Sequence, residues 1–493
     1  MSAKALTIVG KAARGVAVYS VLAAAGKVRS KYLEAEKMRF ALLVGFLILL
    51  RTGLFWFFVV SRGEYYSPDT GLYVQLADNL LKNHVFSLSP SAPFVPDIFR
   101  TPGYPAFLAL IKLLGLHSPY WVVFFQEIIY AGCVWMFFGL GKPVFGEKIA
   151  KIGVIFMLLE TGGLTYPKLL LSETLFLPFV LGTVLVIGLY LRDARWRYMV
   201  IAGAVMGFGA LVRPAILYLP LVIAVTLIVF AYRNARRWLH AGVLLLSFLV
   251  VIAPWMARNY HHFGKIMMTG QQSNMFINYH VPLVWESAKG IHFNKGWEII
   301  HERVDRAVTA REKSIGRPLS MGERFELQQG MALQELFRYP GEYAKQWLYG
   351  ILKTMNGVNL TEFYHAFRLD TGRLHFFQVE ATDFVEKVTI FLKHQDIVVL
   401  LAVFLRVMIS GFALLGVLQI LSRRDCLLWI MMLVNFYFIC VPGPMGYSRF
   451  RFPVEVFWFI QAYLGWLWFA GLLWQKRRLE GTNVDTGGSL AEM

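Results

Sequence analysis

Long runs of apolar residues, separated by short polar connections, dominate the chain. A helix needs about 20 residues to cross a bilayer, although about 17 can suffice. Ten runs fit this requirement and predict membrane-spanning helices at residues 40–60, 119–140, 149–165, 173–191, 198–212, 215–232, 239–257, 397–421, 426–441 and 454–474. Because ten is even, both ends of the chain are expected on the same side of the membrane.

Composition agrees with this pattern. Of 493 residues, 57% are hydrophobic and only 16% are charged, and the mean hydropathy is +0.52. Soluble globular chains carry about 25% charged residues. The composition excludes a soluble enzyme, a disordered chain and a nucleic-acid binder on a membrane tether, and it predicts an all-α polytopic membrane protein. The three cysteines lie inside apolar runs, so they form no extramembrane disulfide framework.

The net charge of +18 is concentrated on one set of connections. Short cytoplasmic loops are rich in Lys and Arg. This rule assigns both termini to the cytoplasm, together with the connections that carry Lys142, Lys148 and Lys151; Arg192, Arg195 and Arg197; Arg233, Arg236 and Arg237; Arg423 and Arg424; and Lys476, Arg477 and Arg478.

The basic segment 1–38 contains one apolar stretch, Val16 to Gly26. It can be interpreted as the core of a signal peptide ending in Ala-Ala-Ala. We favour an amphipathic helix on the cytoplasmic membrane surface, because basic residues flank the stretch on both sides.

The opposite face carries two long segments. Residues 61–118 form a first outer loop within a transmembrane module at 39–257, and residues 258–396 form an outer domain. Residues 397–475 hold the last helices and 476–493 a cytoplasmic tail. In the outer domain, Ser320 followed by Glu323 predicts a capped helix that ends before Pro340. Residues 341–356 predict a second amphipathic helix along the outer interface.

Two positions in the first outer loop are candidates for chemistry. Asp69 lies at the start of a predicted helix, where a carboxylate can instead simply match the helix dipole. Arg100 precedes Thr-Pro-Gly-Tyr-Pro and could clamp a phosphate, or it could snorkel to lipid headgroups.

Further charged residues recur at the outer turns. Glu173 and Lys168 flank the turn before the fourth span, and arginines stand at other outer turns: Arg213, Arg258, Arg449 and Arg451. Short outer loops ordinarily avoid Arg. Outer cations beside carboxylates suit a lipid-linked phosphate leaving group and a general base.

Four more charges fall inside spans, at Arg51, Glu127, Glu160 and Arg406. Pairing of Arg51 with Glu127 or Glu160 would be mainly structural.

Several motifs are absent from the sequence. There is no Walker A loop, no dinucleotide-binding fingerprint, no His-Glu-x-x-His and no Asp-x-Asp pair. The neighbouring His261 and His262 are a weak metal signal. A nucleotide-driven reaction is therefore disfavoured, and no metal site is assigned.

Taken in order, these outer motifs resemble the GT-C glycosyltransferases, and in particular the bacterial group related to protein O-mannosyltransferases and the lipid A aminoarabinose transferase. Asp69-Thr-Gly-Leu-Tyr73 is similar to that family's Asp-Glu-x-x-Tyr pattern. Similar motifs occur at Arg100 to Pro105, Leu171 to Thr174, Arg213-Pro214, Pro254 to Tyr260 and Tyr447 to Pro453. Thr70 replaces the second acidic residue of the family pattern, which weakens a metal role.

The resemblance implies an inverting transferase with a polyprenyl-phosphate sugar donor, undecaprenyl phosphate in bacteria, acting at the periplasmic face of the inner membrane. Asp69 would be the general base and Glu173 its supporting carboxylate. Arg100, Arg258, Arg449 and Arg451 would bind the donor phosphate. Weaker substrate contacts would come from Tyr73, Tyr104, Lys168, Arg213 and Tyr447. The acceptor would be a lipid-linked glycan, lipopolysaccharide or protein; no cofactor is required, and a divalent metal is possible but unsupported.

Two alternatives remain. A lipid-linked glycan flippase would show inverted repeats and broken helices at mid-membrane, and no repeat is visible. A glycan polymerase would use a lipid-diphosphate donor, and released monophosphate or diphosphate lipid would distinguish the two enzymes.

Overall fold

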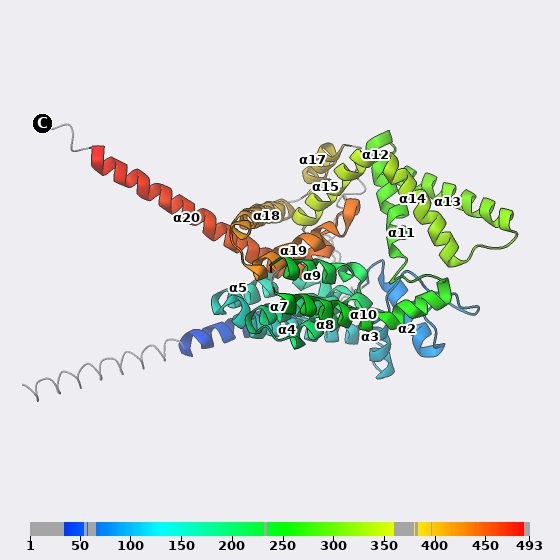
Figure 1. The fold of residues 1–493 in the computed structure, drawn as a ribbon, viewed down its shortest axis with the longest axis horizontal. Coiled ribbons are helices and arrows are strands. Elements are labelled where there is room, and N and C mark those ends of the chain that lie inside the picture. The colour runs from blue at the N-terminus through cyan, green and yellow to red at the C-terminus, as the bar shows by residue number, and fades with distance from the viewer. Residues whose placement is uncertain are drawn as a thin grey trace, which may run out of the picture. The chain divides into compact units, whose positions relative to one another are not determined.

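The computed structural model describes residues 34–53, 57, 66–230, 234–358, 379, 383–395 and 397–487 (Figure 1). The chain divides into two units, residues 1–56 and 57–493, which are described separately. Within the described residues the regular structure is helical, and the only β pairing is an isolated bridge between Ser87 and Pro96. This confirms the predicted all-α class. Most of segment 1–38 lies outside the described residues.

Five helices of the second unit are long and apolar enough to cross a membrane, so the chain is an integral membrane protein. They are α4 (Pro119–Phe145), α7 (Glu173–Asp193), α10 (Ala235–Phe263), α18 (Ile397–Ser422) and the segment Ser448–Trp474, which enters α20 (Glu455–Gly487). Three predicted spans are shorter apolar helices, α8 (Arg197–Val212), Pro214–Phe230 with α9 (Leu219–Phe230), and α19 (Cys426–Cys440). The predicted number of ten spans is not confirmed.

The predicted third span, 149–165, is broken. α5 (Glu147–Leu159) and the stretch Thr161–Lys168 meet at a 52° bend. Glu160 lies at the break, where its carboxylate accepts hydrogen bonds from the backbone N–H groups of Gly162 and Gly163 and so caps the short helix α6 (Thr161–Thr165). The sequence predicts Glu160 inside a continuous span. In the structure it instead binds the free N–H groups at the start of α6.

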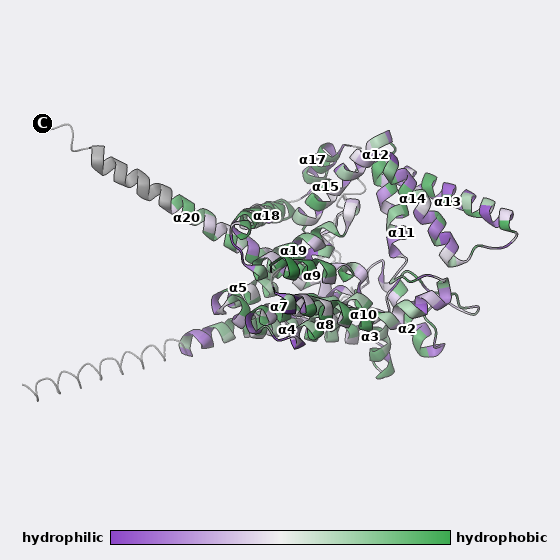
Figure 2. Cartoon of the chain, viewed as in Figure 1, coloured by the Kyte–Doolittle hydropathy of each residue, from purple (hydrophilic) through white to green (hydrophobic). Residues whose placement is uncertain are grey.

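Helix α7 lies at the centre of the bundle. It packs against α4 and α8, α8 in turn packs against α10, and α18 packs against α20. Two thirds of the apolar window of α7 is buried, compared with 22% for α10 and α18. The bundle helices are coloured as hydrophobic along most of their length in Figure 2. Because α7 is enclosed, its first residue, Glu173, is fixed in a buried position.

The outer segment is built from amphipathic helices. They are α11 (Gln271–Met275), the π-helical turn η4 (Phe276–His280), α12 (Val281–Lys289), α13 (Phe293–Ile315), α14 (Met321–Arg338), α15 (Pro340–Asn356) and α17 (Phe384–Lys393). The core that η4, α12, α13 and α14 share surrounds the fully buried Trp285, while purple polar faces alternate with green along α13 and α14 (Figure 2). The predicted capping box of Ser320 and Glu323 is confirmed at the start of α14.

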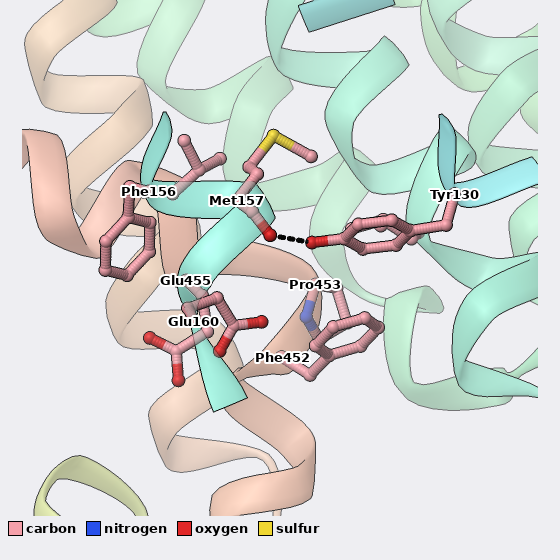
Figure 3. Close-up of a pocket in the computed structure, with 9 residues that line it drawn as sticks. Tyr130, Phe156, Met157, Glu160, Phe452, Pro453 and Glu455 are labelled. Atoms are coloured by element: carbon pink, nitrogen blue, oxygen red, sulfur yellow. Dashed lines mark hydrogen bonds between the residues drawn. The ribbon is translucent and has the colours of Figure 1, made fainter. Parts of the chain in front are cut away.

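The charges inside the bundle pair locally. Lys168 Nζ lies 3.1 Å from Glu127 Oε1, and Arg406 lies 2.9 Å from Glu455. Figure 3 shows the side chains of Glu160 and Glu455 close together, to one side of Phe452 and Pro453. Arg51 belongs to the first unit, so its predicted pairing with Glu127 or Glu160 stays a prediction.

Candidate active site

Five charged side chains from five separate segments meet at one end of the bundle, at the outer turns. Three are arginines and two are carboxylates, which leaves one positive charge in excess; they are Asp69, Arg100, Glu173, Arg213 and Arg449. We call them the outer cluster. The sequence separation between Asp69 and Arg449 is 380 residues. Only the tertiary fold brings these groups together.

Asp69 connects two of the arginines. Its Oδ1 lies 2.9 Å from Arg100 and its Oδ2 lies 3.0 Å from Arg449. Asp69 occupies the N-cap position of α2 (Thr70–Lys82), yet its side chain makes no capping hydrogen bond. The carboxylate is directed at the two arginines, and the alternative that it matches the dipole of α2 stays a prediction.

The electrostatics of Asp69 follow from these contacts. Burial alone would raise the pKa of its carboxyl group, but the guanidinium groups of Arg449 and Arg100 outweigh burial and lower the pKa below its ordinary value. The side chain is 30% exposed, the largest exposed fraction among the five. Asp69 is therefore an ionised carboxylate that a substrate can reach.

Glu173 lies beneath this surface. Its side chain is 1% exposed and contacts the guanidinium groups of both Arg213 and Arg449. Because burying a carboxylate without a partner is costly, these contacts stabilise its charge. Glu173 is positioned to hold two arginines in place and is shielded from a substrate.

Helix α2 is anchored on the loop that precedes α7. The Thr70 hydroxyl donates to the carbonyl of Leu170 over 3.1 Å, and the Tyr73 hydroxyl lies 3.4 Å from the Ser172 hydroxyl. Thr70, which stands where the family has a second acidic residue, thus fastens the start of α2. This anchoring places Asp69 beside Glu173.

Hydrogen bonds of the neighbouring backbone fix the position of Arg100. The Asp97 carboxylate accepts hydrogen bonds from the N–H groups of Phe99 and Arg100, at 3.1 and 2.7 Å. The Thr101 hydroxyl then donates to the carbonyl of Val212 over 3.0 Å. Gly103, at the start of α3 (Gly103–Leu113), packs so closely on the end of α8 that a Cβ atom there would lie 2.8 Å from a backbone oxygen. These contacts bring Arg100 close to the turn of Arg213.

Two predicted phosphate ligands lie outside the outer cluster. Arg258 donates to the carbonyl of Asp97 over 2.8 Å and stacks on Trp255, 4.9 Å from the ring centroid. Arg451 is buried and donates to Glu455 and to the carbonyls of Thr354, Met355 and Gly357. The structure directs both guanidinium groups to backbone carbonyls, so a phosphate role for them finds no support in the geometry.

The weaker predicted substrate contacts also divide into residues at the outer cluster and residues outside it. Tyr73 lies 5.2 Å beneath the Arg100 guanidinium, and Arg213 belongs to the cluster itself. Tyr104 donates to Gln126 over 2.8 Å in the interior, and Lys168 pairs with Glu127. Tyr447 joins its loop to α15 through its backbone N–H, which donates to the Thr354 hydroxyl over 3.1 Å.

Three further residues belong with the site although the sequence did not single them out. Ser172 lies within hydrogen-bond distance of Arg213, at 3.3 Å. Asp97 fixes the backbone at Arg100. Tyr279, in η4, is within electrostatic range of Asp69 and Arg100, and burial, followed by the charge of Asp69, raises the pKa of its phenol. Ser172 sits next to Glu173 in a motif already noted, but Tyr279 carries no sequence signal at all.

Metal ligands are not gathered at this site. Across the ranges that the structure describes, no three His, Cys, Asp or Glu side chains group together in a way that could hold an ion. The cluster instead offers three guanidinium groups, whose planar donor pairs match phosphate oxygens, next to one reachable carboxylate. It can bind an anion and accept a proton beside it.

One family model matches part of the chain. Residues 99–257 match the model of the dolichyl-phosphate-mannose-protein mannosyltransferase family. The match confirms the predicted relationship with GT-C glycosyltransferases, which are transferases that use lipid-linked donors. No curated protein matches the chain.

Two solved structures show distant likeness. One is the archaeal oligosaccharyltransferase AglB from Archaeoglobus fulgidus, in complex with an inhibitory peptide and a dolichol-phosphate, at 15% identity and a TM-score of 0.46 over 84% of this chain. The other is ArnT from Cupriavidus metallidurans bound to undecaprenyl phosphate, at 12% identity and a TM-score of 0.41 over 85% of this chain. The chain covers 48% of the former protein and 77% of the latter.

Proposed function

We propose that this chain is an inverting GT-C glycosyltransferase that moves a monosaccharide from a polyprenyl-phosphate donor to an acceptor hydroxyl at the outer face of the membrane. The observation that carries the proposal is the outer cluster, in which three arginines surround one reachable and one buried carboxylate. The family match over 99–257 supports the same reaction class.

Each group has a role in this reaction. Arg100, Arg213 and Arg449 bind the donor phosphate and neutralise the charge that grows on it as its bond to the anomeric carbon breaks. The acceptor oxygen attacks that carbon from the opposite side, and its proton passes to Asp69. The products are the glycosylated acceptor and polyprenyl phosphate. Glu173 keeps Arg213 and Arg449 in place.

The exposed fractions favour Asp69 over Glu173 as the proposed base. An acceptor hydroxyl must come within about 3 Å of its base. Asp69, at 30% exposed, allows that approach, whereas Glu173, at 1%, does not. Asp69 is therefore the base and Glu173 a positioning residue.

The cell-envelope context follows the charge pattern of the loops. Our proposal locates the outer cluster in the periplasm of a bacterial inner membrane; the basic connections, which favour cytoplasmic termini, support this orientation. Undecaprenyl phosphate is then the carrier, and a lipid-linked glycan, lipopolysaccharide or exported protein is the acceptor.

The test is donor turnover by the full chain in lipid nanodiscs. A panel of polyprenyl-phosphate sugars is offered with an envelope extract as acceptor, and free polyprenyl phosphate is followed. We expect release by the wild type and none by Asp69→Asn. Release of a lipid diphosphate would support a polymerase, and movement of an intact lipid-linked glycan across the bilayer would support a flippase.

A further inference from the structure

The proposed base is occupied in the structure. Both oxygens of the Asp69 carboxylate are bound, one by Arg100 at 2.9 Å and the other by Arg449 at 3.0 Å. A carboxylate held by two guanidinium groups is a poor proton acceptor, because protonation would break two charge-assisted hydrogen bonds. The arrangement seen here is therefore a resting arrangement, which must open before Asp69 can act as a base.

The same two arginines are the ones that a donor phosphate would need. Both guanidinium groups are largely covered, with side chains 15% and 14% exposed, so each has few directions left in which to bind an anion. A phosphate oxygen that approaches them competes with Asp69 for the same N–H groups. The opening that frees the base is thus the event that binds the donor.

We propose that the donor phosphate takes Arg100 and Arg449 from Asp69, so that the base becomes free only when the donor is bound. This inference rests on the proposed function and adds an order to it, donor before acceptor. The phosphate replaces the carboxylate as the partner of two cations and leaves Asp69 beside a new anion. Asp69 then accepts a proton more readily.

Glu173 keeps Arg449 in position while this arginine changes its partner from Asp69 to the phosphate. It also contacts Arg449 and Arg213, and it stays buried. When Asp69 lets go of Arg449, Glu173 still holds that side chain, so the guanidinium group keeps its place. Two carboxylates around one arginine therefore have separate tasks, one permanent and one exchangeable.

The groups that face Asp69 come from several elements. They are Arg100 before α3, Arg449 in η7 (Ser448–Val454), Arg213 after α8 and Tyr279 in η4. Guanidinium groups keep their charge in proteins, and burial raises the pKa of the Tyr279 phenol above its ordinary value. Glu173 is the second titratable group in contact with Arg449, so a variant at Asp69 is needed to separate the two.

The test measures binding rather than turnover. The probe is an isoprenyl methyl phosphodiester, whose single charge does not change near neutral pH, and it is titrated against the full chain in nanodiscs. Asp69→Asn removes the competitor, so we expect this variant to bind the probe about tenfold more tightly than wild type, in proportion to the two partly exposed ion pairs that it loses. In the free chain the two arginines lower the pKa of Asp69. The probe takes those arginines, so the pKa of Asp69 is higher in the complex, and the wild-type affinity should rise as the pH falls from about 7 toward about 4. That pH dependence should vanish in Asp69→Asn.

The matched control is Asp78→Asn. Asp78 lies on the same helix, α2, and pairs with Lys112 over 2.7 Å, outside the outer cluster. Its affinity for the probe should equal that of wild type. Equal or weaker binding by Asp69→Asn, a pH dependence that survives in it, or no binding by any of the three proteins would overturn the exchange. Tight, pH-linked binding without turnover of any sugar donor would overturn the proposed function instead.

Discussion

Arg449 and Arg451 stand two residues apart in the same short helix, yet they belong to different networks. Arg449 contacts two carboxylates that come from other segments, Asp69 and Glu173. Arg451 is bound to Glu455 one helical turn later and to carbonyls at the end of α15. Their side chains are 14% and 2% exposed. Arg449 belongs to a site that opens to substrate. Arg451 belongs to a buried network that joins helices inside the fold.

The buried network of Arg451, Arg406 and Glu455 holds the C-terminus of α15; we call it the clamp. Arg406 donates to the Met355 carbonyl over 3.0 Å and to Glu455 over 2.9 Å, and the Ser410 hydroxyl donates to the same carbonyl. Unpaired carbonyls at a helix end attract cations. The close fit of Gly350 on the Gly443 carbonyl, where a Cβ atom has no room, adds to this docking. The clamp therefore fixes the turn that carries Arg449.

The two arginines differ in the kind of partner that their guanidinium groups bind, and this difference decides whether each can bind a ligand or only support the fold. Backbone carbonyls are fixed and cannot leave, so an arginine that they saturate has nothing to offer a ligand. Carboxylate side chains can rotate away, so an arginine that they hold can change partners. The buried clamp is permanent for this reason, and the outer cluster is exchangeable.

The largest expected effect is on transfer by Asp69→Asn. Loss of a general base lowers the rate by about 10²–10⁴-fold. The melting temperature should change little, because Asp69 is partly exposed. Donor turnover and a thermal melt on the same preparation check this. A variant that keeps wild-type turnover would remove Asp69 from the chemistry.

The second effect is on the clamp. Arg451→Met leaves Glu455 buried with one cation fewer and removes the guanidinium donor from the carbonyls of Thr354 and Gly357. Breaking a buried pair costs about 3–5 kcal/mol of unfolding free energy. A large fall in the melting temperature, with turnover lost in proportion to folded protein, is expected. Unchanged stability would contradict the structural role assigned to Arg451.

The third effect is on Arg449. Arg449→Lys keeps the charge but loses the planar donor pair, so turnover should fall about 10²-fold with a small change in stability. Measured beside Arg451→Met, it separates a binding arginine from a supporting one. If both variants lost stability equally, the division between the two networks would fail.

A smaller effect is expected at Arg258. It acts on the outer cluster only through the loop at Asp97, so Arg258→Gln should reduce turnover about tenfold or less, and affinity for the phosphodiester probe should fall little. Steady-state rates and probe binding check this. Loss of probe binding as severe as in Arg449→Lys would restore Arg258 as a phosphate ligand.

The smallest effect concerns acid stability. The pKa of Asp69 is lowered in the folded chain, so its pairing stabilises the fold above the ordinary pKa of an aspartate and this contribution disappears as the pH falls through the lowered value. Asp69→Asn should therefore show a slightly shallower loss of melting temperature below about pH 4 than wild type. Identical acid profiles would show that the pairing contributes nothing to stability.

Much of this protein follows from its sequence. The apolar runs determine a helical membrane protein, because no other open structure satisfies the backbone in lipid. The Ser320 to Glu323 spacing determines a helix start, since a capping box is a local interaction. The sequence also predicts carboxylates and arginines at the outer turns, among them Asp69 and Arg449, but it leaves open whether they meet.

Tertiary structure alone decided which charged groups meet. The sequence gives Arg449 and Arg451 the same neighbourhood, and it gives Arg258 the same outer position as Arg100. Their partners are carbonyls or carboxylates from segments more than a hundred residues away in several cases, such as Arg258 with the Asp97 carbonyl and Arg449 with Asp69. An arginine's role depends on the atoms that surround its guanidinium group, and the packing of distant helices supplies those atoms.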